Sequence, residues 1–153
     1  MGDGTAADDA FAAFVAEVEP RLRRAFVGWC GVDGAHDATA EALAWAWEHR
    51  TSLADLANPA GYLYRVGQSR SRSRKQGHLP SPADLELPSV EPGLIPALQS
   101  LPEQQRTAVW LVHGCGWTYG ECAEAMSISA SAVGTHVSRA LDALRKTLEV
   151  EDA

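Results

Sequence analysis

The segment from Thr118 to Ser129 carries two helix-start signals close together, and these constrain the fold more than any other part of the sequence. Thr118 and Glu121 have the spacing of a capping box, in which each side chain accepts a hydrogen bond from the backbone N–H of the other residue. Ser127-Ile128-Ser129 interrupts the helical pattern, and Ser129 is a favourable N-cap for a second helix. The sequence therefore predicts two helices joined by a three-residue turn.

The helix after Ser129 has one apolar and one polar face. Apolar residues at helical spacing predict the buried face: Ala130, Val133, Val137, Ala140, Leu141, Leu144 and Leu148. The other face is polar, and most of its side chains are short in the N-terminal half of the helix. It comprises Ser131, Thr135, Ser138, Asp142 and Lys146, with His136 and Arg139 beside them. A helix-turn-helix presents this half of its second helix to the major groove, where arginine reads guanine or binds phosphate. A helical hairpin with a solvated outer face is the alternative interpretation.

The basic residues are concentrated in one short segment of an acidic chain. The net charge is −7, which opposes nucleic-acid binding over most of the surface because affinity for phosphate comes mainly from Lys and Arg. Five basic residues nevertheless follow one another without an acidic one: Arg65, Arg70, Arg72, Arg74 and Lys75. Tyr62 and Tyr64 precede them, and aromatic rings beside arginines can stack unpaired bases. A solvated basic helix end or a flexible Ser-Arg tail remains the alternative.

The N-terminal part of the chain has the periodicity of helices. Its first apolar series is Phe11, Phe14, Val15, Val18, Leu22 and Phe26. Pro20 interrupts this series and predicts two helices or a kinked one, and Gly28 and Gly31 are expected to end it. A further helix is expected from Asn58 and Pro59, an N-cap followed by proline at the first helical position.

Between these helices, residues 35–50 predict a helix with two distinct faces. The face expected in the core comprises Ala35, Ala38, Ala42, Leu43, Ala46 and Trp47. The opposite face carries Asp37, Glu41, Trp45 and Glu48. A tryptophan among carboxylates suits a protein-binding surface, since Trp is enriched at binding hot spots. The alternative is an ordinary solvated face with a partly buried Trp.

The chain is predicted to be all-α, with two small helical modules joined by a proline-rich linker. Residues 76–93 contain four prolines, which exclude a continuous helix. We therefore expect an N-terminal module at 1–75, a linker at 76–93 and a C-terminal module at 94–153. The helices expected in each module are those that the apolar spacing and the helix-start signals above predict.

Neither an enzyme nor an exported protein is indicated. No apolar run is long enough to span a membrane, the N-terminus lacks the features of a signal peptide, and three cysteines form no disulfide framework. These features predict a cytoplasmic protein with reduced thiols. His113, Cys115 and Cys122 lack the fourth ligand that a structural zinc site requires. No catalytic motif is present, so we expect no catalytic residue, metal or cofactor.

The order of parts resembles one family, the extracytoplasmic-function (ECF) type of bacterial RNA polymerase sigma factor. Residues 35–47 are similar to a helix of its region 2, and residues 59–66 are similar to the Trp-Leu-Tyr-Arg-Ile segment that reads the minus-ten element, with Tyr62 in place of Trp. The C-terminal module is similar to region 4, which binds the minus-thirty-five element. The matches there are Leu101-Pro102-Glu103, Thr118-Tyr119, Ile128-Ser129 and Ser138-Arg139-Ala140.

The resemblance implies partners for each surface. Asp37, Glu41 and Trp45 would dock on core RNA polymerase. The minus-ten element would be bound by Tyr62, Arg65, Arg70, Arg72, Arg74 and Lys75. The minus-thirty-five element would be bound by Ser131, Thr135, His136, Ser138 and Arg139. Members of this family are often held inactive by an anti-sigma factor, which makes such a factor a further expected partner.

The sequence departs from the family pattern at several of these surfaces. Ala38 and Ala40 stand where the family usually has Leu and Gln, Ser69 replaces an Asn, and Gly134 replaces a Lys or Arg on the recognition helix. Two alternative hypotheses therefore remain: a stand-alone helix-turn-helix transcriptional regulator, and a sigma-like helical interaction protein with weak or lost DNA binding.

Overall fold

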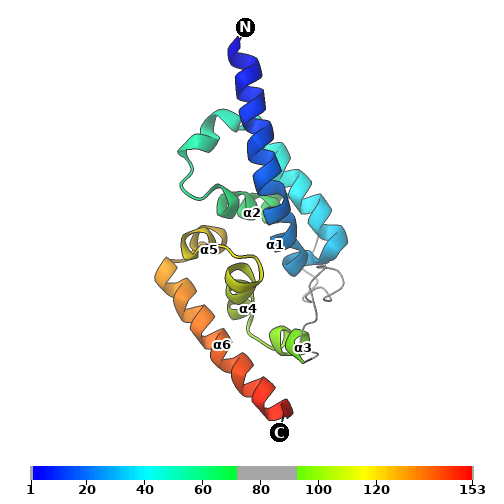
Figure 1. Ribbon diagram of the computed structural model, residues 1–153, viewed down its shortest axis with the longest axis vertical. Coiled ribbons are helices and arrows are strands. Elements are labelled where there is room, and N and C mark those ends of the chain that lie inside the picture. The colour runs from blue at the N-terminus through cyan, green and yellow to red at the C-terminus, as the bar shows by residue number, and fades with distance from the viewer. Residues whose placement is uncertain (1, 72–92, 153) are drawn as a thin grey trace.

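The computed structural model describes residues 2–71 and 93–152, and within these ranges the chain forms helices and no strands (Figure 1). This confirms the prediction of an all-α fold. The predicted linker lies outside the described residues except for Gly93, and so do Arg72, Arg74 and Lys75.

The first helix, α1 (Gly2–Glu48), consists of two segments that meet at Gly31. Gly31 has φ 81°, a backbone conformation that glycine adopts without steric cost. The second segment runs back along the first (Figure 1). The rings of Phe11 and Trp47 are 5.1 Å apart. The predicted end of the first series near Gly31 is therefore confirmed.

Pro20 lies inside the first segment of α1 and does not end it, so of the two predicted alternatives the one with two separate helices at this residue is wrong. Proline removes one helical hydrogen bond, to the carbonyl group four residues earlier. Pro20 and Ala16 are both exposed, so water can hydrate the carbonyl group that is left without a partner.

The remaining helices of the N-terminal module pack against α1. A 3-10 helix, η1 (Arg50–Asp55), leads to α2 (Pro59–Arg70), which begins with proline at its first position as expected. Leu22, Phe26 and Leu63 are completely buried, and the ring of Tyr64 stacks on Phe26 with centroids 4.9 Å apart. A Cβ atom on Gly67 would overlap the ring of Phe26, so this glycine permits the close approach of α2.

Trp47 departs from the predicted core face. Ala35, Ala38, Ala42 and Ala46 are completely buried as expected, whereas Trp47 is 44% exposed. One residue is about 100° of helical rotation, so Trp47 points away from the face that Ala46 shares with the other alanines. Its ring contacts Phe11 and lies 3.9 Å from the guanidinium carbon of Arg50.

The C-terminal module contains four α-helices and a π-helical turn in its described residues. They are α3 (Leu94–Gln99), α4 (Glu103–Val109), the turn η2 (Trp110–Gly114), α5 (Tyr119–Met126) and α6 (Ala130–Asp152). The capping box at the start of α5 is present in both directions: Thr118 N–H donates to Glu121, and Glu121 N–H donates to Thr118, each at 3.0 Å. Val133, Val137, Ala140 and Leu144 of α6 are buried, while Ala130 is exposed because it precedes the first core contact.

The two modules share one apolar core. Helix α2 lies against α5, and α6 extends away from this contact toward the C-terminus (Figure 1). The rings of Tyr64 and Trp117, one from each module, meet edge to face at 5.8 Å. In the part of the chain that the structure describes, no helix is long and apolar enough to cross a membrane.

Phe26 links α1 to α2 within this core, so we expect Phe26→Ala to lower the free energy of unfolding by about 3–5 kcal/mol. Urea denaturation followed by circular dichroism measures the change. Val32→Ala is the matched control, because Val32 is 42% exposed and its truncation is expected to change stability by less than about 0.5 kcal/mol. Equal effects of the two substitutions would contradict the described core.

Candidate nucleic-acid interface

Helix α6 presents most of its predicted DNA-binding residues to solvent. Ser131, Thr135, Ser138 and Arg139 are exposed along its N-terminal half, and His136 is half-buried. Thr135 Oγ1 donates to the carbonyl oxygen of Ser131 at 3.2 Å, which leaves the hydroxyl oxygen able to accept a hydrogen bond. The polar face predicted from the sequence is thus an exposed surface in the structure.

The turn before α6 fixes how this surface is presented. Ser127 ends α5 in the left-handed conformation, with φ 56°. Ser129 Oγ then accepts a hydrogen bond from the N–H of Ala132 at 3.0 Å and caps α6, as the sequence predicted. Val133 is completely buried one turn later and anchors the helix. The N-terminal half of α6 is therefore held by a cap and a core contact.

Tyr119 and Gly134 form a contact within this surface that sequence reasoning did not single out. A Cβ atom on Gly134 would lie 3.3 Å from Cε2 of Tyr119, which is tighter than most contacts of real side chains. Tyr119 is 44% exposed beside α6. Gly134 therefore accommodates the ring of Tyr119.

A second candidate surface lies on α2 and the second segment of α1. Arg65 is exposed, with its guanidinium carbon 5.8 Å from the centre of the Tyr62 ring. The ring of Trp45 lies 5.1 Å from Tyr62, and His49 stacks on Trp45 at 4.1 Å. A hollow of about 310 Å³ adjoins this group. It is lined by Trp45, Tyr62, Arg65, Val66, Ser69 and Arg70.

Trp45 therefore lies with residues predicted to bind the minus-ten element, although the sequence suggested a separate polymerase-binding surface for it. Of the other residues in that predicted surface, Asp37 is exposed and accepts a hydrogen bond from Ser71 Oγ at 3.0 Å, and Glu41 is half-buried. The stacking of His49 on Trp45 was not predicted, although their spacing of four residues places them on one helix face.

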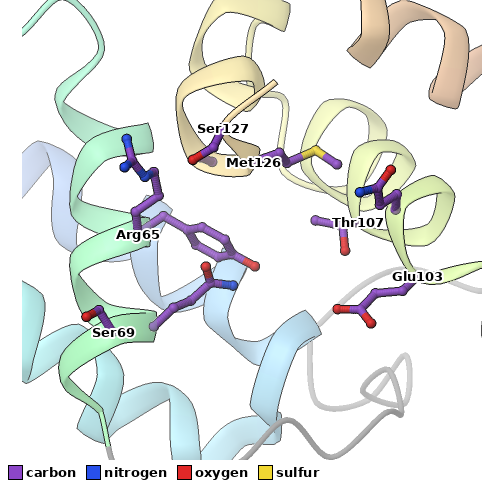
Figure 2. Close-up of a pocket in the computed structure, with 10 residues that line it drawn as sticks. Arg65, Ser69, Glu103, Thr107, Met126 and Ser127 are labelled. Atoms are coloured by element: carbon purple, nitrogen blue, oxygen red, sulfur yellow. The ribbon is translucent and has the colours of Figure 1, made fainter. Parts of the chain in front are cut away.

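The two modules meet across an open groove of about 470 Å³ (Figure 2). Arg65 and Ser69 of α2 lie on one side, opposite Met126 and Ser127 at the end of α5 and Glu103 and Thr107 of α4. No predicted site residue of α6 lines this groove.

Two ion pairs link the modules beside the groove. Arg65 Nη1 lies 3.2 Å from Glu124 Oε2, and Arg21 Nη2 lies 2.8 Å from both carboxylate oxygens of Glu121. Burial opposes ionisation of Glu121, but the Thr118 N–H and the Arg21 guanidinium outweigh it and lower the pKa below its ordinary value of 4.5. The ionised carboxylate therefore stabilises the fold at pH values above 4.5. This contribution is lost as the pH falls through the lowered pKa of Glu121.

The three cysteines are free; Cys30 and Cys122 are buried, and Cys115 is half-buried. Burial raises the pKa of Cys30 to about 11 and the pKa values of Cys115 and Cys122 to about 12. Since the thiolate is the nucleophile and metal ligand, these shifts oppose both reactivities. Among the described residues, no group of three or more His, Cys, Asp or Glu side chains is arranged to hold a metal ion.

The comparisons with known proteins agree with this geometry. Residues 94–144 match the family model described as Sigma-70, region 4. This range includes the capping box, the turn and the exposed face of α6. No curated protein sequence matches the chain.

Two solved structures share the fold along nearly the whole chain. One is the sigma factor RpoE from Bartonella quintana in complex with the anti-sigma factor NepR, with TM-score 0.69 and 22% identity over 92% of this chain and 98% of that chain. The other is CnrH in complex with the cytosolic domain of CnrY, with TM-score 0.66 and 24% identity over 96% and 94%. These likenesses show that the chain shares the fold of the two structures.

The raised pKa values predict slow modification of all three thiols in the folded chain. At pH 8 a thiol with a pKa of about 11 is ionised to roughly one part in a thousand, whereas an unperturbed thiol is ionised to roughly a quarter. Labelling with iodoacetamide, followed by mass spectrometry, should therefore be slow for the native chain and rapid in urea. Rapid labelling of native Cys122, which is completely buried, would contradict the described structure.

Proposed function

We propose that this chain is an ECF-type sigma factor that binds core RNA polymerase and directs transcription initiation at promoters with minus-ten and minus-thirty-five elements. The observation that carries the proposal is the capped helix-turn-helix with an exposed polar face, within the residues that match sigma-70 region 4. This geometry supports major-groove binding by Ser131, Thr135, His136, Ser138 and Arg139.

In this proposal residues 1–75 form a region 2-like module, residues 94–153 form a region 4-like module, and residues 76–93 link them. Tyr62, Arg65 and Arg70 bind the unpaired minus-ten element, and Arg72, Arg74 and Lys75, which lie outside the described residues, are proposed to bind it too. The ring of Tyr62 lines the same hollow as Arg65 and Arg70 and supports base stacking. The structure thus offers aromatic and cationic groups together.

The partners follow from the same role. Core RNA polymerase binds the second segment of α1 through Asp37, Glu41 and Trp45, and promoter DNA binds both modules. An anti-sigma factor is a further proposed partner, supported by the structural likeness to RpoE in complex with NepR. The protein acts in the cytoplasm without a cofactor or catalytic activity.

Binding of both promoter elements at once requires the modules to separate. In the structure Arg65 pairs with Glu124. The chain from Glu124 to Ser131 spans at most about 25 Å. Helix α6 then advances about 12 Å from Ser131 to Arg139. Arg65 and Arg139 are therefore no more than about 50 Å apart. Elements centred about 25 base pairs apart lie roughly 85 Å apart on straight duplex DNA. The described arrangement is too short to span them.

Separated modules on one tether also explain how an acidic chain binds DNA. The second module binds at the effective concentration that the linker sets, so neither module needs high affinity alone. Polymerase contacts add to this effect, which makes the net charge of −7 compatible with promoter recognition.

The proposal predicts that the purified chain associates with core RNA polymerase and gives promoter-specific initiation. Pull-down with core enzyme, followed by sequencing of the transcripts that the reconstituted enzyme starts in vitro, measures both steps. Folded protein that core enzyme does not retain would refute the proposal. A shift of free duplex DNA without core enzyme would instead indicate the stand-alone regulator.

Arg139→Ala is expected to weaken binding of the minus-thirty-five element by about 1–3 kcal/mol, since the guanidinium group of Arg139 can donate two parallel hydrogen bonds from the exposed face. Transcription from promoters identified in the previous experiment measures the loss. Lys146→Ala is the matched control, because Lys146 is exposed on the same helix but nearly two turns beyond Arg139. Activity that is the same for Arg139→Ala and the parent chain would support a sigma-like interaction protein that has lost DNA binding.

A further inference from the structure

Tyr119 is a large hydrophobic side chain exposed on the candidate DNA-binding surface. Its exposed fraction is 44%, and among the described residues the other large hydrophobic side chains left this exposed are Val32 and Trp47 of α1. Within the described part of the C-terminal module, Tyr119 is therefore the large hydrophobic side chain most available to a ligand.

The ring of Tyr119 lies on the polar face of α6. A Cβ atom on Gly134 would lie 3.3 Å from Cε2 and 3.8 Å from Cδ2 of this ring. Gly134 is three residues after Ser131 and four before Ser138, so the three positions share one face of the helix. Ser131 and Ser138 are both exposed there. The ring is thus placed among side chains that, in the proposed function, enter the major groove.

We infer that Tyr119 is a specificity-determining residue, whose ring contacts the C5 methyl group of a thymine in the minus-thirty-five element. The inference rests on the proposed function, because it concerns the promoter element that α6 binds there. It goes beyond that function by assigning a base-reading role to a residue of α5 and by naming the chemical group that is read.

The ring supplies a kind of selectivity that the polar side chains of α6 lack. Thymine is distinguished in the major groove by its C5 methyl group, which apolar side chains contact. Serine and threonine hydroxyls can donate to or accept from any base, and arginine favours guanine. Ser131, Thr135 and Arg139 alone therefore select weakly for an A·T pair, whereas an exposed hydrophobic ring beside them favours it.

Gly134 makes room for this contact. Because glycine has no side chain, no group extends from the middle of the polar face toward the DNA, and the ring keeps its place beside the helix backbone. Any side chain at this position would start at a Cβ atom 3.3 Å from the ring, so the ring or the helix would have to shift. Gly134 and Tyr119 therefore act as a pair.

The ring is held in position before DNA binds. The side chains of Thr118 and Glu121 each accept a hydrogen bond from the backbone N–H of the other residue at 3.0 Å, which fixes the turn of α5 in which Tyr119 lies. Val133, next to Gly134, is completely buried and fixes α6 beside the ring. Tyrosine has only two side-chain torsions, so little conformational entropy is lost when its ring makes a contact. The Tyr119 ring is therefore preorganised.

Replacement of thymine by uracil tests the inference, because it removes the C5 methyl group and leaves the hydrogen-bonding edge of the base unchanged. The full-length chain, reconstituted with core RNA polymerase, is given promoters in which each thymine of the minus-thirty-five element is replaced in turn. We expect the affinity to fall about fourfold at one position, which corresponds to about 0.8 kcal/mol for burial of one methyl group. Competition between thymine and uracil duplexes measures this ratio of affinities.

Tyr119→Ala should remove the discrimination between thymine and uracil at that position. Tyr119→Phe keeps the ring and should retain it, which separates a methyl contact from a hydrogen bond between the tyrosine hydroxyl and phosphate. Val32→Ala is the matched control, since Val32 is 42% exposed on α1 and its truncation should leave the ratio of the parent chain. Circular dichroism verifies that each variant is folded.

Gly134→Lys keeps the inference testable if Tyr119→Ala does not fold. The lysine side chain displaces the ring, and its ammonium group can bind phosphate. We therefore expect a higher overall affinity for promoter DNA together with loss of the discrimination between thymine and uracil. A purely structural role of Tyr119 would not move these two quantities in opposite directions.

The inference and the proposed function fail in distinguishable ways. Equal affinity of the parent chain for thymine and uracil at every position, or discrimination retained in folded Tyr119→Ala or Gly134→Lys, would overturn the role of Tyr119 while promoter binding stands. Loss of discrimination in Tyr119→Phe, or a minus-thirty-five element without thymine, would overturn it as well. Failure of the parent chain to associate with core enzyme or to bind any promoter would instead overturn the proposed function, on which the inference rests.

Discussion

The Glu121 carboxylate takes part in both local and long-range structure. It accepts a hydrogen bond from the Thr118 N–H, which completes the cap of α5, and it also accepts two from Arg21 of α1. The start of the helix-turn-helix and the contact between modules therefore share one charged group. A change in either contact alters the electrostatic environment of the other, so separation of the modules is coupled to the first turn of α5.

The local features of the helix-turn-helix were predictable because their causes are local. The capping box, the turn at Ser127-Ile128-Ser129 and the cap of α6 each depend on residues a few positions apart. The apolar face of α6 follows from helical periodicity for the same reason. These features, together with the order of helices, were sufficient to indicate the fold class and a candidate DNA-binding surface.

The errors and omissions concern effects that depend on the whole structure. Pro20 is tolerated because it and Ala16 are exposed, and Trp47 is exposed because one residue of helical rotation turns it away from the buried alanine face. The pairing of Arg65 with Glu124 joins residues far apart in sequence, and no periodicity predicts it. The close approach at Gly61 is similarly invisible, because a helix pattern does not show which glycine a second helix will contact. The assignment of Trp45 to a polymerase surface remains a prediction.

The Tyr119–Gly134 contact has a consequence for the thermodynamics of DNA binding. In the proposed function, an uncharged ring lies beside the DNA-binding helix where the family that the sequence resembles has a cation, so we expect fewer phosphates to be neutralised when the helix binds DNA. Each neutralised phosphate releases condensed counterions and steepens the dependence of affinity on salt concentration. Discrimination between DNA sequences by this helix should therefore derive more from hydrogen bonds and shape than from ion release. It should change less with ionic strength than the discrimination by a recognition helix that has a cation at this position.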